Sequence, residues 1–282
     1  MRSALYTSFA LIAFAFNSIL CRMALRGGEA DAAGFTLVRL VSGAVTLIVI
    51  SYFFGKGKNF KGRGNWLSAV FLFAYAICFS FAYLGLTAGT GALILFGAVQ
   101  LTMIALAIIR GERPNTLEWI GLAVAVAGLV YLVLPGLSAP PLASSALMAA
   151  AGASWGFYTL RGKGSSSPLA DTTGNFTFAV PMIAVAALPF IGSLYLSSSG
   201  IVLAVLSGAV ASGIGYTVWY TALKHHTATR AAVLQLSVPV IAALAGILFL
   251  AETATARLAI AAALILGGIV LTILGRRRMV IR

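Results

Sequence analysis

Long apolar runs, each separated from the next by a short cluster of polar or charged residues, dominate this sequence of 282 residues. Hydrophobic residues make up 61% of the chain and charged residues only 9%, whereas a soluble chain carries about 25% charged residues. Each run is about 20 residues long, the length at which an α-helix crosses a hydrocarbon core of roughly 30 Å. Because backbone polar groups in lipid must be hydrogen-bonded within their own segment, the runs are predicted to be membrane-spanning helices.

The runs predict an all-α membrane protein with ten transmembrane helices in a single transmembrane domain. The first run, Leu5 to Leu20, is longer than a typical signal-peptide core and lacks a convincing cleavage site, so it is interpreted as the first span. The predicted spans are residues 3–23, 34–54, 66–86, 91–109, 116–135, 142–160, 169–191, 200–223, 228–250 and 256–275.

The chain is further predicted to be one five-helix unit written twice, over residues 1–135 and 142–276. Because five spans is an odd number, the second copy enters the membrane from the opposite face, and a site is expected at the midplane between two inverted repeats. A shift of 140 residues aligns Glu112 with Glu252, Ile120 with Ile260, Gly128 with Gly268 and Val130 with Val270.

Small residues and prolines within the spans predict where helices pack closely and where they kink. Gly152-Ala-Ser-Trp-Gly156 has the small-xxx-small spacing that lets two membrane helices approach closely. Pro181, Pro189 and Pro239 lie within predicted spans, and each removes a helix hydrogen bond and favours a kink.

The net charge of +13 is typical of nucleic-acid binding, but the placement of the cations argues for membrane orientation instead. In the ten-span topology only Arg22, Arg26 and Arg257 fall on one side, and Arg39 lies within a span. By the positive-inside rule, both termini are predicted to face the cytoplasm of a bacterial inner membrane. The remaining fifteen cations share the other side: Arg2, Lys56, Lys58, Lys61, Arg63, Arg110, Arg113, Arg161, Lys163, Lys224, Arg230, Arg276, Arg277, Arg278 and Arg282.

Motifs for catalysis or for a cofactor are incomplete. The stretch 57–62 resembles a phosphate loop, but Arg63-Gly64 stand where Lys and Ser/Thr are needed. Gly152 to Gly156 fits G-x-S-x-G, yet that motif requires a strand-to-helix turn and here lies inside an apolar helix. Cys21 and Cys78 both lie in apolar runs and are interpreted as packing residues. We therefore expect no enzyme, no metal and no cofactor.

Ionisable side chains within the spans would mark a functional site, because each is unfavourable in lipid. Only Arg39 lies clearly inside a span, whereas Asp171, Glu118 and Glu252 fall at span ends. Arg39 could bind a substrate carboxylate, or it could snorkel to the interface or pair within the protein, and its position near a span end favours the second interpretation.

Neutral polar and aromatic side chains within the spans form the candidate substrate site. Tyr75, Phe79 and Tyr83 recur at i, i+4 and i+8, which places them on one face of a helix. The asparagine and the two glutamines of the set would bond the ends of a zwitterion. The predicted substrate-binding residues are Asn17, Tyr75, Phe79, Tyr83, Gln100, Trp155, Tyr158, Tyr216, Trp219 and Gln235.

Two alternatives to a cavity are open for these aromatic residues. An interfacial belt suits Trp66, Trp119 and Tyr220, but it does not suit the mid-span tyrosines. Plain helix packing is the other alternative. We expect an aromatic-lined, uncharged, water-filled cavity that suits a flat, partly apolar, net-neutral solute.

One long segment of the second half resembles a known family. The run ALKHHTATRAAVLQLSVPVIAALAGILFLAE at residues 222–252, followed by a helix that ends in GGIVL, is similar to the signature segment of the EamA-type drug/metabolite transporter superfamily. Ser154-Trp155-Gly156, at the start of the second half, also matches. The resemblance covers nearly the whole chain and implies a transporter of ten helices.

Within that superfamily the chain looks most like the bacterial aromatic amino acid exporters. The resemblance rests on the aromatic positions of the third, sixth and eighth spans, where Tyr75, Trp155, Tyr216 and Trp219 stand. The chain departs from those exporters in two helices. Phe16-Asn17 replaces Trp-Ser/Gly in the first, and Val99-Gln100 replaces Trp-Pro in the fourth.

The sequence therefore predicts an inner-membrane transporter that exports small neutral or zwitterionic metabolites by alternating access, with amino acids, including aromatic ones, as the leading class. Efflux of drugs or other cationic compounds is the alternative, disfavoured because the spans lack a buried carboxylate. A membrane-embedded serine hydrolase is a remote alternative. The expected partners are a small-molecule substrate and membrane lipid, with no nucleic acid, and the protein is expected to be a monomer.

Overall fold

The computed structural model describes residues 2–54, 64–109, 111, 114–134, 136, 139–162, 165–223 and 234–280. Within these residues the regular structure is helical, apart from one isolated antiparallel bridge between Ala30 and Leu196. The helices are α1 (Arg2–Arg26), α2 (Ala32–Phe54), α3 (Trp66–Ala82), α4 (Ala88–Ile109), α5 (Thr116–Val133), α6 (Leu142–Gly162), α7 (Pro168–Ala187) with the 3₁₀ turn η1 (Leu188–Phe190), α8 (Ser198–Val205), η2 (Leu206–Ile214), α9 (Gly215–Leu223), α11 (Ser237–Leu250) and α12 (Ala256–Val280).

Each predicted span contains one of these helices, and α8, η2 and α9 follow one another without a break to form the eighth. Seven of the described spans are long and apolar enough to cross a membrane, and α3 and α11 are shorter apolar helices. The 21-residue α6 completes the set of ten. The prediction of an all-helical membrane protein is therefore confirmed. In the ninth span residues 234–235 are helical, a turn follows at Leu236 and α11 begins at Ser237, while residues 224–233 lie outside the described part.

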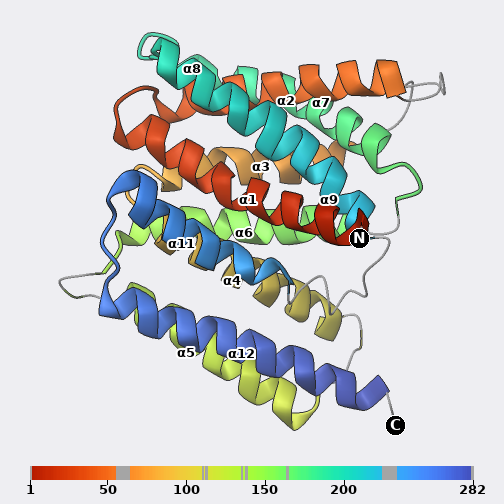
Figure 1. Ribbon diagram of the computed structural model, residues 1–282, viewed down its shortest axis with the longest axis vertical. Coiled ribbons are helices and arrows are strands. Elements are labelled where there is room, and N and C mark those ends of the chain that lie inside the picture. The colour runs from red at the N-terminus through yellow and green to blue at the C-terminus, as the bar shows by residue number, and fades with distance from the viewer. Residues whose placement is uncertain are drawn as a thin grey trace.

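The two halves run in opposite directions. The helix α1 begins, and α12 ends, at the same end of the bundle, which we call the terminal end, and the opposite end is the far end (Figure 1). Arg22 near the end of α1 contacts the carbonyl of Tyr83 just after α3, so α1 and α3 are parallel. Arg161 at the end of α6 contacts Ser68 at the start of α3, so α6 runs against both. The second half therefore starts from the opposite face, as predicted.

Glycines allow the central helices to approach closely, as the small-residue spacing predicts. A Cβ atom on Gly152 would lie 2.4 Å from the carbonyl oxygen of Leu95, where α6 crosses α4. One on Gly208 would lie 2.0 Å from the carbonyl oxygen of Arg39, where η2 crosses α2. No side chain fits at either crossing, so helix backbones from the two halves pack against each other.

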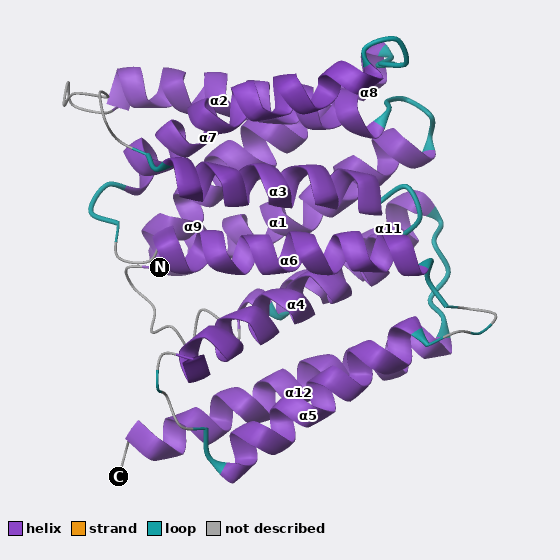
Figure 2. Ribbon diagram, turned by 180° about the vertical axis from the view of Figure 1, so that it is seen from behind, coloured by secondary structure: helices purple, strands orange, loops and turns teal. Residues whose placement is uncertain are grey.

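The pair α5 and α12 lies at one edge of the bundle, visible from both sides (Figure 1 and Figure 2). A Cβ atom on Gly121 would lie 2.5 Å from the carbonyl oxygen of Gly268, so this pair also packs through glycines. Asn115 donates its amide N–H to the carbonyl of Gly275 at 2.7 Å, which joins the start of α5 to α12. The remaining helices surround the centre of the bundle.

The three prolines of the predicted spans lie within or next to described helices. Pro181 lies inside α7, as expected. Pro189 lies in η1, which ends the seventh span, and Pro239 lies in the first turn of α11, where a missing N–H is tolerated. The helix of the ninth span is interrupted by a turn at Leu236, three residues before Pro239, and the seventh span changes from α-helix to a 3₁₀ turn at Pro189. A further irregular element is η2, a nine-residue π-helix in the eighth span.

Candidate functional site

The mid-span rings converge on a small cavity at the centre of the bundle, which we call the central cavity. Its volume is about 10 Å³, which is room for about one water molecule. The cavity is therefore much smaller than the water-filled chamber expected from the sequence, because the rings pack against one another. The cavity is lined by Phe14, Asn17, Tyr75, Phe79, Leu95, Phe96, Trp155 and Tyr216, from α1, α3, α4, α6 and α9.

Edge-to-face and tilted ring contacts hold this cluster together. The ring centroids of Trp155 and Tyr216 are 4.6 Å apart, and those of Tyr75 and Trp155 are 5.0 Å apart. Phe14 contacts both Trp155 and Tyr216, at 5.9 and 5.7 Å. Sequence reasoning did not select Phe14, although it lies three residues before Asn17 and therefore on the same face of α1.

Half of the predicted binding residues line the central cavity: Asn17, Tyr75, Phe79, Trp155 and Tyr216. Tyr158 lines a second small cavity closer to the terminal end. The other four are buried but line neither cavity. Tyr83 donates its hydroxyl to the carbonyl of Ala88 at the far end, and Trp219 packs against Phe14 with 5.8 Å between ring centroids. Gln100 and Gln235, each 3% exposed, also lie outside the two cavities.

The prediction that Tyr220 belongs to an interfacial aromatic belt is wrong. Trp66 and Trp119 are 56% and 52% exposed, as a belt requires. Tyr220 is only 6% exposed and lines the second cavity beside Tyr158. Its position near the end of the span suggested the interface, but its side chain faces the interior of the bundle.

Arg39 is the most polar group at the centre of the bundle, and it does not snorkel. The residue is 1% exposed. Its Nε donates to Ser212 at 3.2 Å, and its NH2 donates to the hydroxyls of Tyr75 and Tyr216 at 3.0 and 3.2 Å. The prediction of snorkelling is wrong because these bonds hold the guanidinium inward, and the partners that the described residues supply are neutral hydroxyls.

The π-helix η2 supplies polar partners to this centre. Ser207 donates to the side-chain oxygen of Asn17, whose amide nitrogen donates to the Tyr75 hydroxyl at 3.1 Å. Ser212, also on η2, accepts from Arg39. Short π-helical segments are often found at functional sites. The sequence LSGAVASGI of η2 carries no periodic signal for such a segment, so sequence reasoning missed it.

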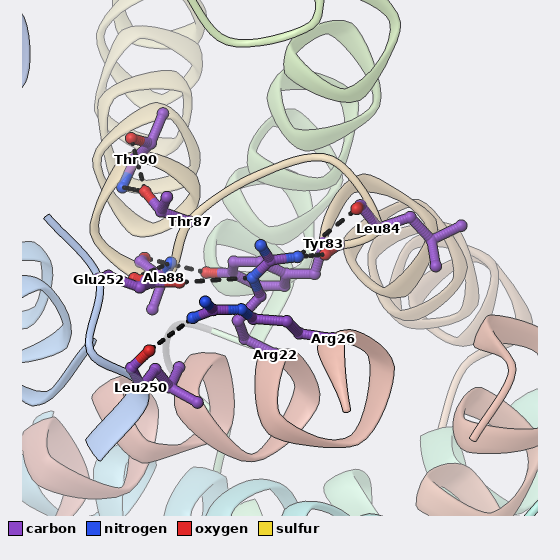
Figure 3. A network of polar contacts seen from close by, with 9 residues as sticks. All are labelled: Arg22, Arg26, Tyr83, Leu84, Thr87, Ala88, Thr90, Leu250 and Glu252. Atoms are coloured by element: carbon purple, nitrogen blue, oxygen red, sulfur yellow. Dashed lines mark hydrogen bonds and ion pairs between the residues drawn. The ribbon is translucent and has the colours of Figure 1, made fainter. Parts of the chain in front are cut away.

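At the far end, charged side chains tie α1 to the α3–α4 connection and to the α11–α12 connection, and we call Arg22, Arg26 and Glu252 the far-end latch (Figure 3). Nε of Arg22 lies 3.4 Å from Oε1 of Glu252. The other carboxylate oxygen accepts the backbone N–H of Ala88, at the start of α4, at 2.9 Å. Arg26 donates to the carbonyl of Leu250. The latch therefore joins α1, the start of α4 and the loop between α11 and α12.

A second set of contacts closes the same end. The side chain of Asp31 accepts from the backbone N–H of Tyr195 at 2.7 Å, and Ser197 donates to the side chain of Glu29. With the bridge between Ala30 and Leu196, these contacts attach the loop before α2 to the loop before α8.

The terminal end is built differently. The described residues there surround a hollow of about 310 Å³, lined by Gly64, Asn65, Ser68, Arg161, Gly162, Ser166, Asp171 and Asn175, which we call the terminal hollow. The second cavity, of about 20 Å³, shares Gly162, Asp171 and Asn175 with it and also contacts Tyr158. Asn175 donates to the Tyr158 hydroxyl at 3.4 Å. The rings of Tyr158 and Trp155 are 5.4 Å apart, so Tyr158 stands between the hollow and the central cavity.

The serine-hydrolase alternative finds no support in this geometry. Ser154 lies within α6 rather than on a strand-to-helix turn. Asp171 accepts from the hydroxyl of Ser165 at the terminal end. The histidines His225 and His226 lie outside the described residues.

A bundle of membrane-spanning helices around a small buried cavity is the architecture of a multi-pass membrane protein. The sequence profile of the EamA-like transporter family matches residues 1–134 and 143–274. The chain therefore belongs to the EamA-like transporter family and is a transporter, not an enzyme. The limits of the two repeats, 1–135 and 142–276, stay a prediction.

Similar proteins agree with this assignment. An uncharacterised protein of Pseudomonas aeruginosa is 48% identical over 275 residues, which cover 98% of this chain and 96% of that protein. A probable amino-acid metabolite efflux pump of Escherichia coli is 28% identical over 222 residues, 72% of this chain and 73% of that protein. A solved crystal structure that is 21% identical covers 98% of both chains with a TM-score of 0.68, and so shows the same fold.

Proposed function

We propose that this protein exports small neutral or zwitterionic metabolites across the bacterial inner membrane, with amino acids, including aromatic ones, as the leading class. The observation that carries the proposal is the central cavity, where rings from both halves meet at the middle of the bundle. Flat, partly apolar solutes stack on such rings. Distant relatives described as probable amino-acid metabolite efflux pumps support the same class.

Alternating access fits the difference between the two ends. The central cavity is too small for an amino acid, so its rings must separate when a substrate binds. The far end is tied by the latch, while the terminal end leads through the hollow to Tyr158. Rocking of one repeat against the other would release the far-end contacts as the terminal end closes.

The orientation in the membrane is part of the proposal. Arg22, Arg26 and Arg257 lie at the far end, as the ten-span topology requires. Most of the other cations belong to clusters outside the described residues, such as 56–63 and 224–230. With the positive-inside rule, the terminal end and both termini face the cytoplasm, so the hollow would open to the cytoplasm.

Efflux of cationic compounds is the weaker alternative, because a cation would meet Arg39 at the centre. The test is flux of labelled phenylalanine, tryptophan and threonine in sealed vesicles that contain the purified protein. We expect flux of at least one of the three above that of protein-free vesicles. Absence of flux for all three would remove amino acids as the substrate class.

A further inference from the structure

Arg39 carries a buried positive charge with no acidic partner among the residues that the structure describes. The ion pair found in that part of the chain, between Arg22 and Glu252, lies at the far end. The faces of the Tyr75 and Phe79 rings lie 5.2 and 4.9 Å from the guanidinium carbon and stabilise the cation in part. Buried charges in proteins are usually paired, because an isolated charge is strongly unfavourable in a low dielectric. Among the described residues, therefore, the charge of Arg39 is balanced by ring faces and hydroxyl groups alone.

The hydrogen bonds of the guanidinium leave one nitrogen free. Arginine has five N–H donors. One on Nε serves Ser212, and two on NH2 serve Tyr75 and Tyr216. NH1 is buried and has no hydrogen-bond partner in the described part of the chain. Its two N–H groups, next to NH2 in the same plane, remain for a ligand.

The two tyrosines extend this donor set to the central cavity, which both of them line. The Tyr75 oxygen accepts from Arg39 and also from Asn17, at 3.0 and 3.1 Å, which occupies both of its lone pairs. The hydroxyl oxygens of Tyr75 and Tyr216 lie 3.4 Å apart. Even if one hydroxyl donates to the other, one hydroxyl proton is left for a ligand in the cavity.

We propose that NH1 of Arg39 and the hydroxyls of Tyr75 and Tyr216 form a carboxylate-binding site beside the central cavity, so that the transported substrates are carboxylates with an apolar body. A carboxylate oxygen would accept from NH1, and its negative charge would offset the buried positive charge of the guanidinium. The body of the ligand would then stack on Trp155 and Phe14. This inference rests on the proposed function for the claim that the carboxylate is transported, but binding can be tested without transport.

The binding experiment compares two ligands that share a phenyl ring and differ in charge. 3-Phenylpropionate has a carboxylate and no amine, whereas phenethylamine has an amine and no carboxylate. Binding to the purified protein is followed by tryptophan fluorescence, because Trp155 lines the cavity. We expect the carboxylate to bind at least about 10-fold more tightly than the amine, since a hydrogen bond to a charged group contributes about 1.5–3 kcal/mol.

Substitutions at Arg39 and Tyr216 test whether the carboxylate binds at the proposed site. Arg39→Gln should weaken binding of 3-phenylpropionate at least about 10-fold, and Arg39→Lys should weaken it less. Tyr216→Phe, which removes one donor and keeps the ring, should weaken it several-fold. If Arg39→Gln does not fold, Arg39→Lys and Tyr216→Phe carry the test. The matched control is Arg257→Gln, because Arg257 bonds the backbone carbonyl of Leu134 at the far end and should leave binding unchanged.

Equal binding of the two ligands, no binding of the carboxylate, or unchanged binding in the Arg39 variants would each overturn the site. Phenylalanine flux separates this result from the proposed function. If phenylalanine is transported while the amine binds as tightly as the carboxylate, the amino acid proposal stands and the Arg39 site is wrong. If Arg39-dependent carboxylate binding is found without amino acid flux, the site stands and the substrate class of transport is wrong.

Discussion

At the far end of the bundle, charged side chains tie the loops together, whereas at the terminal end the described residues surround a polar hollow of about 310 Å³. Glu252, with a side chain only 6% exposed, joins Arg22 to the start of α4. At the terminal end, by contrast, Arg161 is exposed while it bonds Asn65 and Ser68. Buried charge pairs lose more when one partner is removed than exposed pairs do. The two ends should therefore respond unequally to matched substitutions.

The backbone near Glu252 is shaped for this contact. Ala251 has a φ of 49°, a left-handed conformation that ends α11 and turns the chain toward α4. A Cβ atom on Gly246 would lie 2.5 Å from Oε2 of Glu252, so a glycine leaves room for the carboxylate. A carboxylate at the N-terminus of α4 also interacts favourably with the helix dipole.

The largest effect is expected for Gly200→Ala at the far end. A Cβ atom there would lie 2.1 Å from the carbonyl oxygen of Glu29, so the loops before α2 and α8 must separate. We expect the free energy of unfolding in detergent to fall by about 1–3 kcal/mol. Gly192→Ala is the matched control, because no atom lies within 4 Å of a Cβ at that position, and it should change stability by less than about 0.5 kcal/mol. Equal stability of the two variants would show that the far end is not tightly packed.

A smaller effect is expected when the latch is broken. A double-mutant cycle of Arg22→Gln and Glu252→Gln should give a coupling energy of about 1 kcal/mol, because both side chains are largely buried. Arg161→Gln at the terminal end should change the free energy of unfolding by less than about 0.5 kcal/mol. A coupling energy near zero would mean that the latch does not hold the far end closed.

The smallest change is expected for Tyr158→Phe between the terminal hollow and the central cavity. This substitution removes the hydroxyl that accepts from Asn175 and keeps the ring. Stability should fall by no more than about 1 kcal/mol, while the exchange of substrate across vesicle membranes should become faster because the constriction is looser. Slower exchange with unchanged stability would indicate that the hydroxyl binds substrate instead of restricting its passage.

Much of the fold could be predicted from the sequence, because the membrane imposes both the length and the apolar character of each span. The same periodicity placed Tyr75, Phe79 and Tyr83 on one buried face, with exposed fractions of 4%, 1% and 0%. The odd number of spans in each half predicted that the two halves run in opposite directions. The span lengths and the buried face of α3 each depend on a single helix, and the directions of the two halves depend only on the number of helices.

The parts that could not be predicted depend on contacts between helices far apart in the sequence. Arg39 lies near a span end, but partners on η2, α3 and α9 hold it inside. Tyr220 is also near a span end and yet faces Tyr158, with ring centroids 6.3 Å apart. Gln100 and Gln235 are polar and mid-span, but nothing in their spacing indicates that they lie outside the central cavity. Helix rotation and tertiary packing decide these cases.

The most direct measurement is the flux of labelled phenylalanine into sealed vesicles that contain the wild type, Trp155→Ala or Trp119→Ala. Trp155 lies in the central cavity at 3% exposure, whereas Trp119 is 52% exposed on the outer surface of α5. If the ring cluster between the two halves binds the substrate, Trp155→Ala lowers the flux at least about 10-fold, and Trp119→Ala leaves it unchanged. Wild-type flux in a folded Trp155→Ala protein would contradict the account.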